Sequence, residues 1–199
     1  MNCGSAFSLH SALCPKCLKY LVGSFRSDSE LNIRGAKLIT LMIWNPNQSD
    51  LLSNLIIHLK RSDDKTWSLL AQEFLLNRRL EILKDAILVS LVSDGNKSHG
   101  QMWGQSLSDL TGIPHIRALS KVKNQNESQS QKGKNRSQRQ VLELSMIVDI
   151  SVLSNKKVIF VDDVVTTGAT LLAARKALDE PANFECWSLC YRNPLTIAN

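Results

Sequence analysis

Residues 158–170 read Val-Ile-Phe-Val-Asp-Asp-Val-Val-Thr-Thr-Gly-Ala-Thr: four apolar β-forming residues run into two carboxylates and then into a hydroxyl-rich turn. A continuous apolar run is typical of a strand buried on both faces, and the Ala- and Leu-rich run 171–178 is typical of a helix. The pattern predicts a parallel strand that ends at Asp162 and Asp163 and leads through the turn into a helix.

The turn has the composition of a phosphate site. A helix that starts after a glycine-containing turn presents free backbone N–H groups, and these bind anions. Gly168 allows a close backbone approach or a positive φ, and Ala169 keeps the wall of the site low. Thr166, Thr167 and Thr170 add hydroxyl donors. Because ligands of open α/β sheets bind at the carboxyl ends of strands, we expect this turn to hold a phosphate group.

The two carboxylates must serve another part of the ligand, because they repel phosphate. Carboxylates beside a phosphate site suit a sugar diol whose hydroxyls donate to them, or a Mg²⁺ ion carried by the ligand. Asp162 and Asp163, together with the turn, therefore predict a ribose 5-phosphate site. The alternative is an ordinary strand-to-helix turn with an Asp or Thr cap, which accounts for one acid but not for the whole string.

The same residues closely resemble the phosphoribosyl pyrophosphate (PRPP) loop of type I phosphoribosyltransferases. In that loop a hydrophobic strand, two acids and a Thr-Thr-Gly-x-Thr turn recur as one unit, and residues 158–170 match it in about thirteen consecutive positions. The resemblance implies that Asp162 and Asp163 hold the ribose hydroxyls, directly or through metal. It also implies that Thr166–Thr170 hold the 5-phosphate.

The rest of the chain alternates strand-like and helix-like segments. Apolar runs bounded by turn residues predict strands at 37–44, 86–92, 114–119, 158–161 and 184–191. Periodic apolar patterns predict helices at 50–60, 66–83, 101–111, 137–148 and 169–179. This order predicts an α/β fold in which a parallel sheet has helices on both faces, and it matches the core of a type I phosphoribosyltransferase.

The positive charge of the chain is concentrated in the segment 117–139, which we predict to be a mobile basic loop. Seven basic residues and one acidic residue, Glu127, give it a formal charge of +6, equal to that of the whole 199-residue chain. Residues 124–131 contain no apolar side chain and cannot pack into a core. Three interpretations remain open: a lid over a polyanionic ligand, a contact with nucleic-acid phosphates, and a solvated linker. Its position before the 158–161 strand favours the lid.

The N-terminal segment 1–22 carries cysteines at a spacing typical of zinc knuckles. Cys14 and Cys17 are separated by two residues, and Cys3 followed by glycine resembles the end of a second knuckle. A closed zinc site needs four ligands. Either His10 is the fourth, or translation starts upstream and supplies another cysteine, or the set is an incomplete remnant. A redox Cys-x-x-Cys is a weaker alternative, because nothing around it resembles a thioredoxin βαβ unit.

A cysteine knuckle in front of such a core resembles the ComF family, also called the GntX-like or competence protein F family. Leu55-Ile-Ile-His-Leu-Lys60 resembles the helix that precedes its core, and residues 131–139 resemble its Gln-x-Gly-Leu-x-Arg-x-x-Arg string. The chain departs from the family at residues 88–92, where the family has Pro-Val-Pro. It departs again at residues 99–103, where the family has Arg-Gly-Phe-Asn-Gln. The resemblance implies a phosphoribosyltransferase-like domain over residues 30–199.

The resemblance implies a protein that binds PRPP and Mg²⁺ and transfers the phosphoribosyl group to a nitrogen acceptor, with a link to DNA uptake. Two sets of residues would hold the pyrophosphate: Ser93 and Gly95 in the turn after the 86–92 strand, and Lys132, Lys134, Arg136 and Arg139 in the basic loop. The alternative is a non-catalytic protein that senses PRPP or binds single-stranded DNA within the competence machinery. Outside these sets, we interpret His99 as a surface residue and Trp103 as a core residue.

Other classes of protein fit the sequence less well. The longest apolar runs are too short to span a bilayer, so we expect no membrane insertion. Residues 1–21 lack the basic start and apolar core of a signal peptide, and we therefore expect a cytoplasmic protein with reduced thiols. Gly133-Lys134 lacks the glycine and the hydroxyl residue of a Walker nucleotide-binding loop. The oligomeric state does not follow from the sequence.

Overall fold

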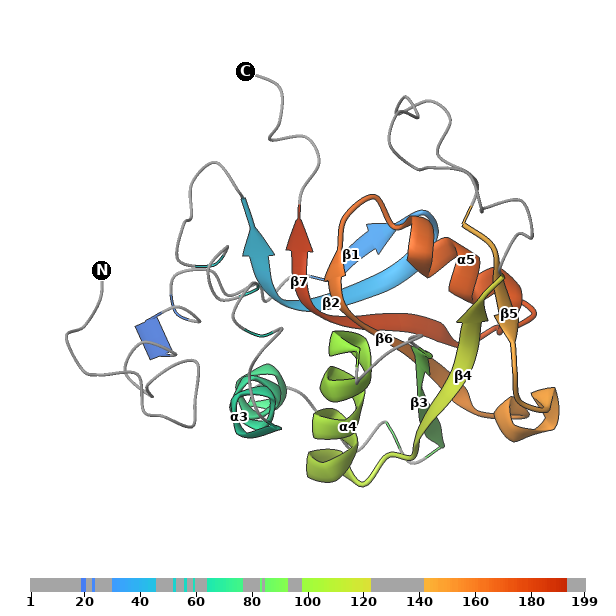
Figure 1. Cartoon of the computed structure of the whole chain (residues 1–199), viewed down its shortest axis with the longest axis horizontal. Helices are drawn as coiled ribbons and strands as arrows, with labels where there is room; N and C mark the ends of the chain where they lie inside the picture. Colours follow the sequence, from blue (N-terminus) through green and yellow to red (C-terminus); the bar gives the residue numbers. More distant parts are fainter. Residues whose placement is uncertain are drawn as a thin grey trace, which may run out of the picture.

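The computed structural model of the chain describes residues 19–20, 23, 30–45, 52, 56, 59, 64–76, 83, 85–92, 98–122 and 142–192. Within these ranges the chain forms a seven-stranded sheet in the order β1-β2-β7-β6-β3-β4-β5 (Figure 1). The five central strands are parallel to one another, whereas β1 and β5 pair antiparallel at the two edges. The α/β fold expected from the sequence is confirmed, with a mixed rather than a purely parallel sheet.

The strands and helices have the following bounds. The strands are β1 (Glu30–Ile33), β2 (Ala36–Trp44), β3 (Ala86–Leu91), β4 (His115–Lys121), β5 (Leu144–Met146), β6 (Lys157–Val165) and β7 (Phe184–Arg192). The helices are α3 (Asp64–Leu75), α4 (His99–Thr111), α5 (Ala169–Ala177) and the 3-10 helix η3 (Ile150–Leu153). None of the helices in the described ranges is long and apolar enough to cross a membrane.

All five predicted strands are present, and three of the predicted helices correspond to α3, α4 and α5. The predicted helix at 50–60 lies outside the described residues, apart from isolated positions. The predicted helix at 137–148 is wrong in its described part, where residues 144–146 form β5. The physical reason is the alternation of Leu144, Met146 and Val148, which places all three side chains against one core layer, as a strand does.

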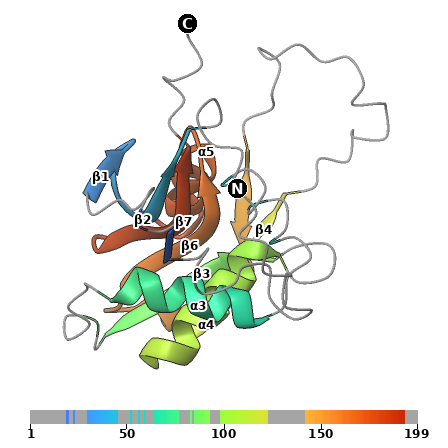
Figure 2. The same ribbon diagram turned by 90° about the vertical axis from the view of Figure 1, so that its left-hand side faces the viewer.

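The helices cover both faces of the sheet. In Figures 1 and 2, α3 and α4 lie together on one side, while α5 lies on the other side. On β6, Ile159 and Val161 pack into the layer beneath α3 and α4, whereas Val158 and Phe160 pack into the layer beneath α5. Both faces of β6 are therefore buried, which explains why its first half reads as a continuous apolar run.

The sheet opens at the carboxyl end between β3 and β6. The chain leaves β3 through α4 toward β4, and it leaves β6 through α5 toward β7, so the two crossovers diverge from neighbouring strands. The β3–β6 ladder ends at Val89 and Phe160, but β6 stays paired with β7 as far as Val165 and Tyr191. Such a point, where strand order reverses, is where ligands bind in open α/β sheets.

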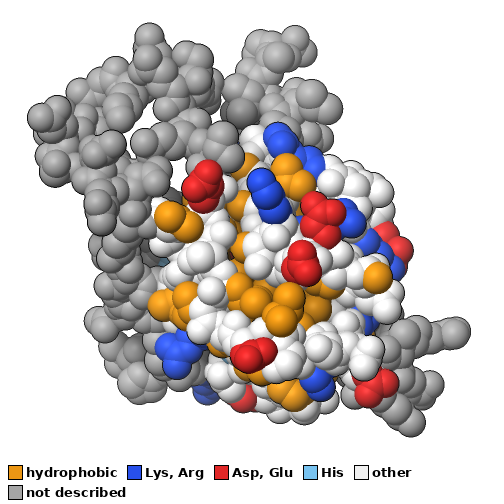
Figure 3. Space-filling model, turned by 90° about the vertical axis from the view of Figure 1, so that its right-hand side faces the viewer, with side chains coloured by type: hydrophobic (Ala, Val, Ile, Leu, Met, Phe, Trp, Pro, Cys, Tyr) orange, Lys and Arg blue, Asp and Glu red, His pale blue; other side chains and the backbone are white. Residues whose placement is uncertain are grey.

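The face around the β5 edge carries exposed apolar side chains. Figure 3 shows this face, on which hydrophobic side chains gather near β5 and η3. Ile147 is 53% exposed, Ile150 46% and Val152 41%. Because β5 has only three residues, the edge offers little backbone for pairing with another strand.

Candidate functional site

The acidic pair lies where β6 separates from β3. The predicted strand 158–161 is longer in the structure, because pairing with β7 carries β6 through Asp162 and Asp163 to Val165. Pairing with β3 has already ended at Phe160. The two carboxylates therefore sit on a paired strand rather than in a loop, and their backbone is held by β7 while the β3 side is open.

An open cleft of about 610 Å³ lies beside this pair. Its walls come from the carboxyl ends of β3, β4 and β6 and from the start of α4: Leu91, Val92, Ser98, His99, Gly100, Ser120, Lys121, Val161, Asp162 and Asp163. Lys121 is the one lysine or arginine among these lining residues, and it faces two carboxylates. The lining is therefore too acidic to hold a polyanion without an additional cation.

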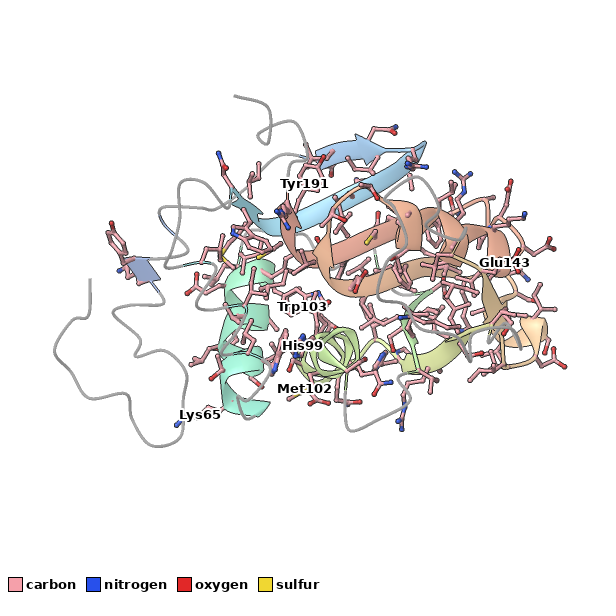
Figure 4. The ribbon with its side chains drawn as sticks, turned by 45° about the horizontal axis from the view of Figure 1, so that its top comes forward. Lys65, His99, Met102, Trp103, Glu143 and Tyr191 are labelled. Atoms are coloured by element: carbon pink, nitrogen blue, oxygen red, sulfur yellow. The ribbon has the colours of Figure 1, made fainter. Side chains whose placement is uncertain are left out.

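His99 is a site residue that the sequence interpretation missed. Its Nδ1 lies 2.9 Å from Asp163 Oδ2, and the two side chains are 18% and 27% exposed. The Trp67 ring on α3 lies 5.7 Å from the imidazole, centroid to centroid, and Figure 4 shows His99 at the start of α4 on the side toward α3. The interpretation of His99 as a surface residue is therefore wrong, because the fold brings it against β6.

Trp103 follows one turn later on α4 and is fully buried, as expected for a core residue. Its indole Nε1 donates to the backbone carbonyl of Trp187 at 3.2 Å. Gly104, the next residue, has no room for a side chain, because a Cβ would lie 2.6 Å from His115 Nε2 and 2.8 Å from Val161 Cγ2. This close approach of α4 to the sheet places the start of the helix over the acidic pair.

The two adjacent carboxyls have different pKa values. Burial, followed by the negative charge of Asp163, raises the pKa of Asp162 well above its usual range. Burial also opposes ionisation of Asp163, but the hydrogen bond and charge of His99, together with hydrogen bonds from the Asp162 side chain and the backbone, outweigh it and lower the pKa of that carboxyl. Asp163 is therefore the more readily ionised partner, and Asp162 keeps its proton to higher pH.

The predicted phosphate turn forms the start of α5. Gly168 occupies the N-cap position in the left-handed region, with φ of 74°, and no side chain caps the helix. Leu172 N donates to Gly168 O in the first helical turn. Within the described ranges, the backbone N–H groups of Thr167–Thr170 have no acceptor. Uncapped N–H groups at a helix start are the donors that bind phosphate.

A second cavity, of about 280 Å³, lies beside α4 and the start of β4. Its carboxylate, Asp109, accepts a hydrogen bond from Gln105 Nε2 at 2.7 Å. His115 Nε2 lies 2.9 Å from Ser90 Oγ, and burial followed by the nearby Arg117 charge lowers the pKa of His115. Because its one carboxylate already has a hydrogen-bond partner and it contains no paired carboxylates, we place the candidate site at the β6 cleft.

Several predicted site residues lie outside the described residues. They comprise the turn residues Ser93 and Gly95, the basic residues Lys132, Lys134, Arg136 and Arg139, and the zinc candidates Cys3, His10, Cys14 and Cys17. Of the predicted basic loop, Arg117–Lys121 belong to β4, and Lys121 reaches the cleft. The available signal for Lys121 was its position just after the predicted strand 114–119, since the carboxyl ends of parallel strands lie at one edge of a sheet.

The acidic pair has oxygen donors of the kind that magnesium prefers. Within the described residues, no group of three or more His, Cys, Asp or Glu side chains is placed to hold a metal by itself. Asp162 and Asp163 supply hard oxygen donors, and Mg²⁺ typically binds through one or two carboxylates while substrate oxygens and water complete its shell. The donor set is thus compatible with a shared ion.

No family model matches the sequence, and no curated protein sequence matches it. Among solved structures, the chain is similar to a hypoxanthine phosphoribosyltransferase from Staphylococcus aureus, with 15% identity and a TM-score of 0.42 over 64% of each chain. It is also similar to an allosteric regulatory enzyme of purine biosynthesis, with 18% identity and a TM-score of 0.40. That match covers 92% of this chain and 31% of the other. The chain spans less than two thirds of the length of either structure.

Proposed function

We propose that this chain binds PRPP with Mg²⁺ at the β6 cleft and transfers its phosphoribosyl group to a nitrogen acceptor. One observation carries the proposal: the paired carboxylates in the cleft are followed, three residues after Asp163, by a turn that opens an uncapped helix. The carboxylates suit ribose hydroxyls or a metal, and the free N–H groups suit a phosphate. Ribose 5-phosphate carries both kinds of group, the ring hydroxyls and the phosphate.

The chemistry assigns each group a role. In the displacement, the bond between the anomeric carbon and the pyrophosphate oxygen breaks, its electron pair leaves with pyrophosphate, and the acceptor nitrogen forms the new bond and then loses its proton. Asp163, the more ionised carboxylate, holds a ribose hydroxyl and favours the positive charge that develops on the ribose ring. Mg²⁺, when bound, offsets the charge of the pyrophosphate. The turn Thr166–Thr170 anchors the 5-phosphate and so fixes the position of the ring.

The pyrophosphate requires more positive charge than the described lining contains. Lys121 contributes one cation beside two carboxylates. In this proposal the basic segment supplies the remainder through Lys132, Lys134, Arg136 and Arg139, and Ser93 and Gly95 present the turn after β3. A basic segment that closes over the ligand would also exclude water from the reacting carbon.

The ComF resemblance extends the proposal to a cytoplasmic protein linked to DNA uptake, with zinc bound by the cysteine segment. The alternative function, a PRPP sensor or a single-stranded DNA binder without transferase activity, is favoured by the +6 charge of the segment 117–139. It is opposed by the lack of Phe, Tyr and Trp in that segment, because single-strand binding usually combines cations with aromatic side chains. Metal analysis of the purified chain, expected to yield zinc, tests the cysteine segment.

The decisive experiment is a calorimetric titration of the whole chain with PRPP, with and without Mg²⁺. Ribose 5-phosphate and pyrophosphate serve as partial ligands, and nucleobases are then added while pyrophosphate release is followed. We expect Mg²⁺-dependent binding and release with at least one acceptor. Binding without release would favour the sensor. Failure to bind PRPP or ribose 5-phosphate would overturn the proposal, and a strong salt dependence of DNA binding would then support the alternative.

A further inference from the structure

A hairpin distant in sequence packs directly against the predicted phosphate turn. The two residues between β1 and β2 are Arg34 and Gly35, and Arg34 Nε donates to the backbone carbonyl of Thr167 at 2.9 Å. Behind the turn, a Cβ at Gly168 would lie only 2.5 Å from Ile33 Cγ2. The hairpin therefore forms the back wall of the turn from which the 5-phosphate donors come.

Peptide geometry gives the Arg34 contact a directional consequence. The carbonyl of Thr167 and the N–H of Gly168 belong to one planar trans peptide, so they point in opposite directions. Since Arg34 holds the carbonyl toward the hairpin, the Gly168 N–H points away from the hairpin. No described residue accepts a hydrogen bond from that N–H, and no side chain caps α5. The contact thus aims one free donor toward the open side of the turn.

The hairpin is itself held in place by several contacts. Asn32 Oδ1 accepts a hydrogen bond from Gly35 N at 3.0 Å, and Lys37 pairs with Glu30 across the two strands at 2.6 Å. From α5, Arg175 Nη1 donates to the carbonyl of Gly35 at 3.2 Å. These contacts join the hairpin to α5 and help to place the guanidinium, so that the turn need not be ordered by the ligand alone.

The backbone of Arg34 is unusual for an arginine. Its φ of 53° lies in the left-handed region, which costs a non-glycine residue about 1–2 kcal/mol. Glycine, asparagine or aspartate would occupy such a hairpin position at lower cost. A strained residue that also makes a contact 133 positions away in sequence is an observation that points to a role for its side chain.

We infer that Arg34 is a positioning residue for the 5-phosphate, which it serves by fixing the Thr167–Gly168 peptide with the Gly168 N–H directed at the ligand. This inference rests on the proposed function. It makes the β1–β2 hairpin part of the phosphoribosyl site, although the hairpin precedes the acidic pair by more than a hundred residues. Arg34 acts through the backbone of the turn.

The test compares Arg34→Met with Arg175→Met. Each variant removes one arginine hydrogen bond between the β1–β2 hairpin and the α5 region, but only the first releases the carbonyl of Thr167. Calorimetry measures affinity for ribose 5-phosphate, for PRPP with Mg²⁺, and for pyrophosphate with Mg²⁺. We expect Arg34→Met to weaken the first two by the same factor, about tenfold, which is the scale of one charge-assisted hydrogen bond. Pyrophosphate affinity should remain unchanged.

Further variants separate positioning from a purely structural role. Arg34→Lys keeps a cationic donor and should recover part of the lost affinity, whereas Arg175→Met should lower the melting temperature without selective loss of ribose 5-phosphate. Equal losses in the two Met variants, or an unchanged affinity in Arg34→Met, would overturn the inference while leaving the proposed function intact. If the wild-type chain bound no ribose 5-phosphate, the proposed function would fail, and the inference with it.

Discussion

The starts of α4 and α5 flank the same end of the sheet but satisfy their backbone donors differently. At α4, Ser98 Oγ accepts a hydrogen bond from Gln101 N at 3.2 Å, so the chain closes this helix start itself. At α5, Gly168 has no side chain with which to cap, and the first N–H groups stay open. The difference shows that a place at the carboxyl end of a sheet is not sufficient for an anion site. The cap residue decides which helix start is available to a ligand.

Replacing the glycine at the open start should have the largest effect. Gly168→Ala adds a Cβ that would lie 2.5 Å from Ile33 Cγ2, at a φ of 74°. We expect a loss of stability of about 2–4 kcal/mol, combining left-handed strain with overpacking, and a loss of ribose 5-phosphate binding of at least about a hundredfold. Denaturant unfolding and calorimetry measure the two effects.

The matched control is Gly112→Ala at the C-terminal cap of α4. Its φ of 72° is almost the same, but no atom lies within 4 Å of the added Cβ. It should therefore cost only the backbone strain, about 1–2 kcal/mol. Equal costs at the two positions would mean that the hairpin does not confine the turn. Ile33→Ala in the Gly168→Ala background should recover part of the stability.

The acidic pair offers a second comparison, because its members should respond in opposite directions. Because folding raises the pKa of Asp162, the free energy of unfolding falls as the pH rises above the pKa that this carboxyl has in the unfolded chain. Asp162→Asn removes this loss and should therefore stabilise the apo chain at pH 7. Folding lowers the pKa of Asp163, so its ionisation stabilises the fold at any pH above the pKa that it has in the unfolded chain. Asp163→Asn should therefore destabilise the fold at pH 7. Melting-temperature shifts of about 2–4 °C are expected in each direction.

Acid conditions provide the control for this pair. The stabilisation from Asp163 is lost as pH falls through its lowered pKa, so the two variants should converge toward wild type at low pH. The two single variants have opposite effects on stability, but the double variant with Asn at both Asp162 and Asp163 should weaken PRPP binding by more than about tenfold. Two variants that shift the melting temperature in the same direction at pH 7 would contradict the assignment of different proton affinities.

Changes at the start of α4, which Ser98 caps, should have the smallest effect on stability. Ser98→Ala removes the oxygen that accepts from Gln101 N and should cost about 1 kcal/mol of stability, whereas Ser98→Gly should cost a few tenths. Denaturant unfolding measures both. If Ser98→Ala lowered the free energy of unfolding by nearly as much as Gly168→Ala, the proposed difference between the two helix starts would be contradicted. In that difference, the start of α4 needs only a cap, whereas the hairpin confines the start of α5.

Contacts between sequence neighbours could be predicted, and contacts across long separations could not. The strand, the acids and the turn at 158–170 form one continuous string whose composition defines its local structure. His99 meets Asp163 across 64 positions, and Arg34 meets Thr167 across 133. No local pattern encodes such a pairing, because the topology of the sheet brings the residues together. The wrong prediction of a helix where β5 lies has a related cause. A short apolar run fits the spacing of a helix as well as that of a strand until pairing with another strand selects one.

The separation of β3 from β6 means that one strand has two local stabilities. Before Phe160, β6 is hydrogen-bonded on both edges, whereas the stretch from Val161 to Val165 is held by β7 alone. The second half should therefore exchange its amide hydrogens through smaller, less costly openings than the first half. The acidic pair thus lies on backbone that is ordered enough to position a ligand yet able to open without unfolding the sheet, and a bound phosphoribosyl compound would slow amide exchange in that half.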